Sequence, residues 1–280
     1  MKANYIFNVI CVSMLCPVAA QASDCVSLTG DPTPGALLWG QTTPTSVVRL
    51  DQTPVPVLPD GSFVIGLGRD APQWVTLEVS EADQAPCEQA IAVSSRVYKV
   101  DRVNGVPQKT VTPLDEDLAR IASERTLTRA AKAQRIQRPD LFAAAKAGFS
   151  WPAVGRISGV YGSQRIYNGT PGNPHYGVDV AVPTGTPVLA PGLGIVTLAQ
   201  PDLYYSGGTV ILDHGYGLSS SFLHMSRVDV QVGDELSTGD LIGAVGATGR
   251  ATGPHLDWRM SWLNQRVDPQ LLVPAMPKAP

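Results

Sequence analysis

Residues 188–198 read VLAPGLGIVTL and residues 208–215 read GTVILDHG, and these two stretches decide the fold class. Both contain short apolar runs rich in valine, isoleucine and leucine, and both are bounded by glycine, proline or a His-Gly pair. Such runs favour β-strands, and the Pro-Gly pair at 191–192 marks a turn between two of them. Similar strand candidates follow at 232–235 and 239–243. From Phe149 to Pro280 we therefore expect a compact, mostly antiparallel β domain.

The chain before this domain divides into two segments with different sequence patterns. From Cys25 to about Lys99, apolar runs at 36–40, 46–50, 62–66 and 73–79 alternate with turns, which predicts a small antiparallel β-sandwich. From Thr112 to Gly148 the apolar spacing is helical, and Pro139 ends one helix and opens a shorter one. The expected fold is mainly β, with a sandwich at 23–111, a helical connector at 112–148 and the β domain at 149–280.

The helical connector carries many basic residues. We interpret them as a solvated helix face, with a partner-binding face as the alternative. The residues concerned are Arg120, Arg125, Arg129, Lys132, Arg135 and Arg138.

Residues 1–22 have the composition of an export signal. Lys2 supplies a positive start, residues 5–15 are mostly apolar, and Ala20-Gln21-Ala22 has the form of a cleavage site. The apolar run is too short to span a bilayer, and no later stretch approaches about 18 apolar residues. We therefore expect a mature chain that begins at Ser23, has no transmembrane segment, and is periplasmic or secreted.

Composition narrows the function classes. The 280 residues are 44% hydrophobic and 16% charged, against about 25% charged in average domains. The 27 glycines and 24 prolines exceed the usual share without a collagen-like period, which favours a turn-rich β protein over a helical bundle. The formal net charge is −3 and no block of like charge is present, so we expect no nucleic-acid partner.

Two of the four cysteines, Cys25 and Cys87, remain after removal of the signal. An even pair in an exported protein predicts a disulfide, and the alternative is two separate buried thiols. In either case these cysteines stabilise structure, and neither has the setting of a nucleophile.

The residues that can carry chemistry cluster in the C-terminal region, which contains all four histidines: His175, His214, His224 and His255. His175 and Asp179 are four apart in a run that favours a strand, so they would share a face. His255 and Asp257 are two apart and would share a strand face in the same way. Either pair alone is equally well explained by a His–Asp hydrogen bond. His214 needs no role beyond the turn that it begins, and His224 alone is typical of a buried core histidine.

Together, His175, Asp179, His224, His255 and Asp257 form a chemically sensible set. Catalytic zinc is held by three protein ligands and keeps one open position. Two further histidines can then transfer protons or stabilise an oxyanion. The sequence therefore predicts a metal site, provided that the fold brings these residues together.

The chain resembles the lysostaphin/LytM-type zinc peptidases of bacterial cell walls from about Trp151 to Leu272. The N-terminal part is similar, more loosely, to the accessory region of exported proteobacterial members. The stretches that carry the resemblance are GVYG (159–162), HYGVD (175–179), PVLAP (187–191), DHGYG (213–217), LHMS (223–226), VGD (232–234), GATG (246–249) and GPHL (253–256).

The resemblance implies roles for individual residues. His175 and Asp179 match two zinc ligands of the family, and Asp257 stands at the place of the third. His255 is the first histidine of the family's H-x-H pattern, and with His224 it is implied to act as a general acid or base. Such enzymes hydrolyse peptide bonds in the stems or cross-bridges of peptidoglycan, which is therefore the implied partner and substrate.

Asp257 departs from the family, which has histidine at that place. A His, Asp, Asp set would make a bound zinc formally neutral, and its two carboxylates also suit manganese. One hypothesis is a working metal-dependent endopeptidase, which the four intact positions favour. The alternative is an inactive module that binds the wall or activates another wall hydrolase. The variant Asp257→His discriminates between them, because it would gain activity only if the aspartate had impaired the site.

Overall fold

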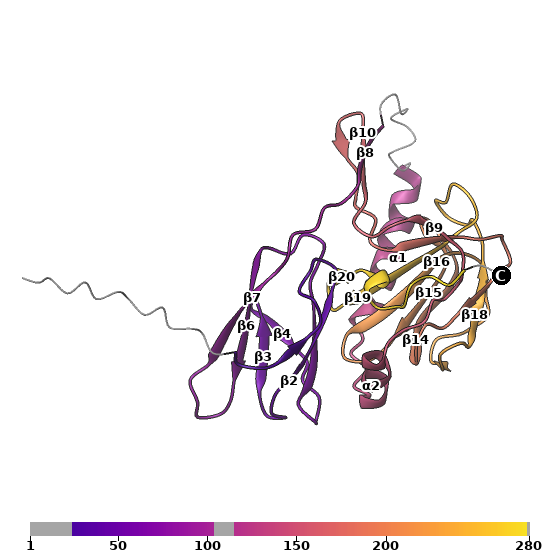
Figure 1. The fold of residues 1–280 in the computed structure, drawn as a ribbon. Coiled ribbons are helices and arrows are strands. Elements are labelled where there is room, and N and C mark those ends of the chain that lie inside the picture. Colours follow the sequence, from indigo (N-terminus) through magenta and orange to yellow (C-terminus); the bar gives the residue numbers. More distant parts are fainter. Residues whose placement is uncertain (1–23, 104–114, 279–280) are drawn as a thin grey trace, which may run out of the picture.

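The computed structural model describes residues 24–103 and 115–278, and it is mainly β in both halves (Figure 1). The expected fold class is confirmed: an N-terminal sandwich is followed by two helices and a C-terminal antiparallel β domain. The expected export signal and the first residues of the expected helical connector lie outside the described residues.

The N-terminal sandwich consists of two antiparallel sheets, ordered β1-β2-β5 and β4-β3-β6-β7. Inward-facing side chains alternate with exposed ones along β6, as a half-buried strand requires. The core between the sheets includes Phe63, Ile65 and Leu77, all fully buried. The strands are β1 (Leu28–Thr29), β2 (Leu37–Gln41), β3 (Val47–Leu50), β4 (Thr53–Val55), β5 (Ser62–Gly66), β6 (Trp74–Ser80) and β7 (Cys87–Ala92).

A disulfide joins Cys25 to Cys87 and ties the start of the sandwich to the edge strand β7. The two residues are 62 apart in sequence, so the bond closes a long loop. The loop-entropy relation then gives a stabilisation of about 4 kcal/mol, at the upper end of typical disulfides.

We expect the double variant Cys25→Ser/Cys87→Ser to lose about 3–4 kcal/mol of unfolding free energy. Urea unfolding with and without a reductant measures this loss. The double variant serves as its own control, because it should not respond to the reductant. An unchanged urea midpoint for the reduced parent would contradict the prediction.

Two helices follow, α1 (Asp115–Ala133) and α2 (Pro139–Ala147). Pro139 opens α2 in the first turn, where its missing N–H costs nothing. Gly148 ends α2 at φ 118°, and its N–H donates to the carbonyl of Ala145. The positions of Pro139 and Gly148 in the sequence predicted the start and the end of α2.

The C-terminal β domain is one large sheet whose main path runs β17-β14-β15-β16-β19-β12-β9. β18 pairs with β13 and β16, β20 pairs with β19, and all of these pairs are antiparallel. The strands are β9 (Arg156–Gly159), β12 (Val178–Ala181), β13 (Pro187–Leu189), β14 (Gly194–Leu203), β15 (Gly207–Asp213), β16 (Leu218–Val228), β17 (Glu235–Leu236), β18 (Leu241–Val245), β19 (Leu256–Trp262) and β20 (Gln265–Val267), followed by a 3-10 turn at Pro269–Leu271.

A small third sheet links the two halves of the chain. β8 (Val100–Val103) runs parallel to β10 (Gln164–Tyr167), and β10 also pairs with β11 (Thr170–Pro171). Figure 1 shows β8 and β10 side by side in a protruding arm. A strand from the N-terminal half therefore braces the hairpin that leads to His175.

The sandwich and the β domain share one core. Phe142 of α2 stacks edge-on against Trp39 of β2 and Tyr216 of the β domain, with ring centroids 5.2 and 5.7 Å apart. Arg96 forms an ion pair at 2.5 Å with Asp268, whose side chain is fully buried. These contacts fix the position of the sandwich relative to the β domain.

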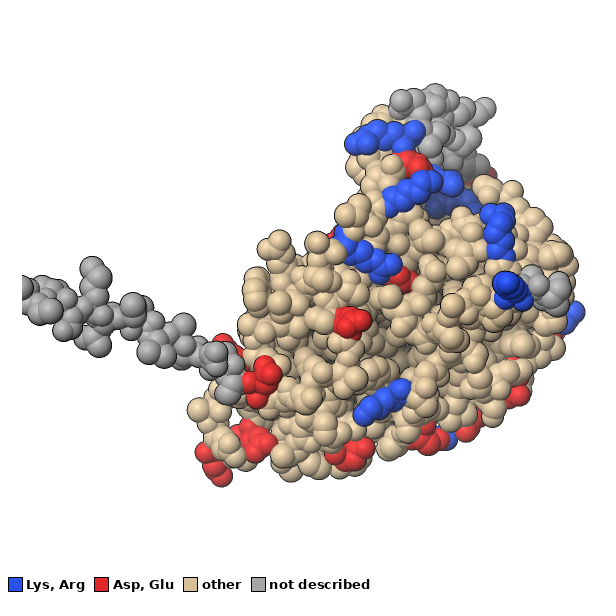
Figure 2. Space-filling model, viewed as in Figure 1, with Lys and Arg blue, Asp and Glu red and all other residues tan. Residues whose placement is uncertain are grey.

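Charged residues are distributed unevenly over the face of the molecule in Figure 2. Lys and Arg lie mainly over its upper half, near β8, β10 and α1, and Asp and Glu gather along the lower edge. Among the described residues, no helix combines the length and apolar character needed to cross a membrane.

Candidate metal centre

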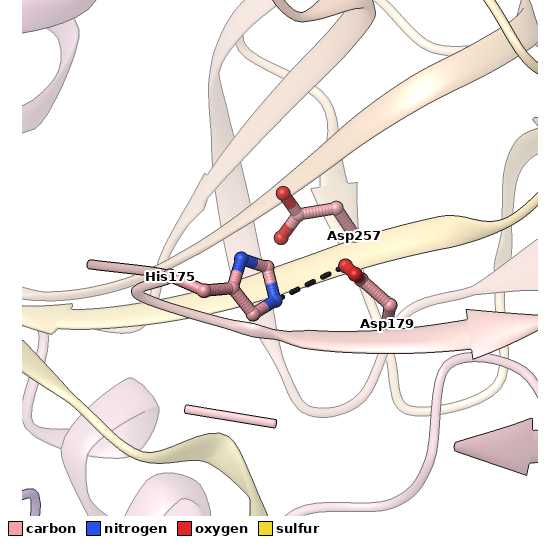
Figure 3. Close-up of side chains that lie close together, drawn as sticks. All are labelled: His175, Asp179 and Asp257. Carbon is pink, nitrogen blue, oxygen red and sulfur yellow. Dashed lines mark ion pairs between the residues drawn. The ribbon is translucent and has the colours of Figure 1, made fainter. Parts of the chain in front are cut away.

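Three side chains from separate parts of the β domain meet at one point: His175, Asp179 and Asp257 (Figure 3). Asp179 lies on β12 directly opposite Asp257 on β19, so the register of this strand pair places both carboxylates on one face. His175 lies before β12 rather than within it, which differs from the expected strand. It still reaches the site, because its Nε2 lies 3.1 Å from Asp179 Oδ1.

Two of the polar atoms at this point have no hydrogen bond to the described part of the chain. One potential ligand atom from each of the three residues lies within 4.8 Å of the others. His175 Nε2 and Asp179 Oδ1 are buried atoms without a hydrogen bond among the described residues. Buried polar atoms are normally paired, so a cluster of unpaired donor atoms fits a bound cation.

Two glycines make room for the carboxylates. A Cβ at Gly159 would lie 2.2 Å from Asp179 Oδ2, and a Cβ at Gly177 would lie 2.6 Å from Asp257 Oδ1. Both distances are far below van der Waals contact, so a side chain at either position would displace the carboxylate. The imidazole and two carboxylates therefore sit in a cradle that fits zinc or manganese ligation.

Asp257 has a partner that the sequence analysis missed. Its side chain is 2% exposed, and Arg259 donates to it through Nε at 3.0 Å and through Nη2 at 2.5 Å. Burial alone would raise the pKa of Asp257, but the Arg259 charge and hydrogen bonds lower it, so the carboxylate is ionised. Residues two apart on a strand have their side chains on the same face. The spacing of Asp257 and Arg259 could therefore have indicated this pair from the sequence.

His255 and His224 lie next to the three-residue cluster. Their ring centroids are 4.8 Å apart, and His255 Nε2 is 3.9 Å from Asp179 Oδ1. Each Nδ1 lies 2.8 Å from a backbone carbonyl, that of Thr248 for His224 and that of Gly253 for His255. A carbonyl only accepts, so each Nδ1 carries the proton and each Nε2 is left as a base. Burial lowers the pKa of His224, which keeps it neutral.

The backbone at His224 is strained. Its φ is 65°, a left-handed value that is uncommon for a residue other than glycine. At this residue β16 exchanges one partner for another, since Leu223 pairs with β19 and Met225 pairs with β18. Such strain costs of order 1–3 kcal/mol and is concentrated at functional sites. No pattern in the sequence indicates this backbone conformation.

Thr248 anchors the turn that faces His224. Its hydroxyl donates to the carbonyl of Met225 at 2.8 Å and accepts from the N–H of Gly208 at 2.9 Å, while its own carbonyl holds His224. The GATG stretch at 246–249 therefore has a structural role, because it holds the His224 ring through Thr248.

His214 lies outside the cluster. It is fully buried, its Nδ1 donates to the carbonyl of Leu193 and its Nε2 lies 2.8 Å from the Ser220 hydroxyl. Burial lowers its pKa to about 4, so it is a neutral core residue. This position agrees with the expectation that it needs no catalytic role.

Comparisons with known proteins agree with this geometry. Residues 173–269 match the model of peptidase family M23. A crystal structure of a Pseudomonas aeruginosa protein assigned to peptidase M23 is 32% identical, with a TM-score of 0.66. The similarity covers 87% of this chain and 95% of that one, so it includes the sandwich as well as the β domain.

Two curated relatives have named activities. The peptidoglycan DD-endopeptidase ShyA of Vibrio cholerae is 39% identical over 106 residues, which are 38% of this chain and 24% of the relative. The DD-carboxypeptidase/endopeptidase Mpg of Neisseria meningitidis is 38% identical over 95 residues, which are 34% of this chain and 22% of the relative. The matched segment thus spans about a quarter of the length of these relatives.

Proposed function

The chain belongs to peptidase family M23, and on that premise we propose that it is a metal-dependent endopeptidase that hydrolyses peptide bonds of peptidoglycan. The observation that carries the proposal is the convergence of His175, Asp179 and Asp257 beside two histidines with free Nε2 atoms. The relatives named as peptidoglycan endopeptidases support the same substrate class. We further propose that the protein is exported to the periplasm, where this substrate lies.

His175, Asp179 and Asp257 would hold one divalent ion, zinc or manganese. When bound, such an ion polarises the scissile carbonyl and makes a water molecule acidic at neutral pH. Since only three side chains contribute, a position stays open for water and substrate.

His255 and His224 supply the proton chemistry. Each directs its Nδ1 to a backbone carbonyl, which leaves Nε2 to accept and release a proton. One of them accepts the proton of the attacking water at Nε2, and the imidazolium that results can donate this Nε2–H to the oxyanion before it passes the proton to the leaving amine nitrogen. The Nε2 of the other ring can accept a hydrogen bond from the same water. The close approach of their rings lets both reach the same reacting carbonyl.

Arg259 makes the unusual aspartate compatible with this chemistry. With the three ligands alone the metal site would be formally neutral, because two carboxylates cancel the charge of the ion. The guanidinium of Arg259 offsets one of them, so the four residues carry the formal charge of two histidines and one carboxylate. A bound ion then keeps a net positive charge, which activation of water needs.

We expect the purified chain to bind one equivalent of zinc or manganese, and His175→Ala to bind it at least 100-fold more weakly. The reason is that the imidazole is one of only three ligands, and its loss removes a full coordinate bond. Equilibrium dialysis with elemental analysis measures the binding, and Asp31→Asn, an exposed carboxylate of the sandwich, is the control. Equal affinity in His175→Ala and the parent would rule out this ligand set.

Digestion of purified sacculi tests the proposed function. The full chain is supplied with zinc or manganese, and the products are resolved by chromatography and mass spectrometry with His175→Ala as the control. Loss of cross-linked fragments with the parent only is the expected result, and the new ends identify the bond. A metal-loaded parent that binds sacculi without cutting them would instead favour the inactive wall-binding module.

A further inference from the structure

A second polar site lies on the same face of the sheet as the metal centre. We call it the basic crevice and define it by Lys132, Arg259, Arg266, Ser221 and Ser261. Ala131 at the end of α1 packs against Leu198 and Ile211, which brings the neighbouring Lys132 over the sheet. Lys132 therefore departs from the solvated helix face expected for it. Its Nζ lies 3.5 Å from the hydroxyl of Ser261.

Two cations of the crevice have no carboxylate partner. Arg259 is paired with Asp257, but among the described residues neither Lys132 nor Arg266 forms an ion pair. The residues outside the described ranges include no Asp or Glu. Arg266 Nη1 donates to the same Ser261 hydroxyl at 2.9 Å. Two positive groups thus converge on one hydroxyl oxygen.

This arrangement is electrostatically unfavourable without a ligand. Burial lowers the pKa of Lys132 well below its usual range, and the nearby charges of Arg266 and Arg259 lower it further. Burial likewise lowers the pKa of Arg266. Desolvated cations of like sign destabilise one another, and an anion between them removes that cost.

The crevice also has a surplus of hydrogen-bond donors. Ser221 lies opposite Arg259 in the β16–β19 pair, so both side chains are on one face. Its hydroxyl is buried, with the residue 3% exposed, and it has no hydrogen bond among the described residues. Ammonium and guanidinium groups only donate, and the unpaired Ser221 hydroxyl can donate as well, so an acceptor satisfies all of these groups at once.

Solvent and ligands can reach this site. The side chain of Arg259 is 28% exposed, and Lys132 and Arg266 are each partly exposed. A cavity of about 310 Å³ lies beside Arg266, between the 66–72 loop of the sandwich and the 264–266 turn. Tyr176, the neighbour of His175, lines the same cavity. A ligand would therefore reach the basic crevice along the exposed parts of Arg259, Lys132 and Arg266.

We propose that the basic crevice binds a carboxylate group of the peptide substrate. The inference rests on the proposed function, since it names a subsite for the same substrate. Ser261 follows Asp257 by four residues on β19, about 13 Å at the rise of a strand. An extended peptide has nearly the same rise, so the bound carboxylate lies about four residues from the bond at the metal centre.

Binding of two muropeptide probes tests the assignment. The probes are the disaccharide peptide released from sacculi by a muramidase, with its amine acetylated, and the same compound with its carboxyls converted to amides. Calorimetric titration uses the full chain as His255→Ala, which prevents turnover. We expect the amidated probe to bind about 10-fold more weakly or worse, because charge-assisted hydrogen bonds are lost.

In each of the variants Lys132→Met and Arg266→Met, the affinities for the two probes should lie within about threefold of each other. Methionine matches the length of these side chains and suits a buried position, so folding is retained. Lys132→Arg should restore the preference for the acidic probe. The exposed residues Lys146 and Arg129 provide the matched controls Lys146→Met and Arg129→Met, which should keep the full preference.

Equal binding of both probes by the parent, or an unchanged preference in Lys132→Met and Arg266→Met, would overturn the assignment. Inorganic phosphate that displaced the acidic probe at equal concentration would show a general anion site and overturn it as well. Suppose that sacculi are not cut, but that the preference for the acidic probe depends on Lys132 and Arg266. The proposed function is then wrong, and the assignment of the crevice as a carboxylate site is retained. If sacculi are cut but the preference is absent, the crevice alone fails.

Discussion

In the variant His255→Ala, hydrolysis of sacculi is expected to fall by about 100- to 10,000-fold, the usual contribution of a positioned acid–base group. The imidazole is fixed by its bond to the Gly253 carbonyl and presents Nε2 next to the carboxylate of Asp179. Alanine removes that base without touching the three-residue cluster, so the variant should still bind one metal equivalent. Initial rates of soluble fragment release, with metal content measured on the same samples, report both effects.

Two companion variants make this result specific. His175→Ala should lose activity and metal together, whereas Thr252→Ala, an exposed position three residues before His255, should retain both. Full activity in His255→Ala would contradict the proposed proton transfer. Loss of metal in that variant would instead assign His255 to the ligands.

The second large effect is expected at Asp257 and Arg259. Asp257→His should lower the free energy of unfolding by about 2 kcal/mol, below the 3–5 kcal/mol of a fully buried pair, because Arg259 is left without its carboxylate but is partly exposed. It should also lower hydrolysis at least 10-fold, because an unpaired cation beside the metal repels it. A loss of activity in Asp257→His would show that the pocket is adapted to the aspartate.

A double-mutant cycle isolates the pair. We expect Asp257→His combined with Arg259→Gln to recover most of the stability and activity that Asp257→His loses, because the set of two histidines and one carboxylate then stands without a stray charge. Arg259→Gln alone should reduce activity while retaining metal. Strictly additive effects of the two substitutions would show that Arg259 is not the electrostatic partner proposed here.

Local patterns predicted much of the fold and the site. Period-two alternation located β6, and Pro139 with Gly148 bounded α2, because these signals act within a few residues. The opposition of Asp179 and Asp257 follows from strand pairing, which spacing alone does not specify. The resemblance to a known family supplied that step.

Other features were beyond the reach of local patterns. The burial of Lys132 depends on where α1 packs, which is decided by apolar contacts with strands far along the chain. The parallel pairing of β8 with β10 joins segments more than 60 residues apart. The left-handed backbone of His224 accompanies an exchange of strand partners along β16. The residue types at this position do not indicate such a conformation.

The shared core has a consequence for protein engineering. A fragment that began at Phe149 would keep the metal centre. It would lack Arg96, the ion-pair partner of the buried Asp268, and Phe142, which contacts Tyr216. It would also lack β8, so the edge of β10 would be unpaired. A buried charge without its partner and a bared strand edge both promote unfolding and aggregation. We therefore expect the β domain to fold poorly without the sandwich, so fusions or domain exchanges should include both.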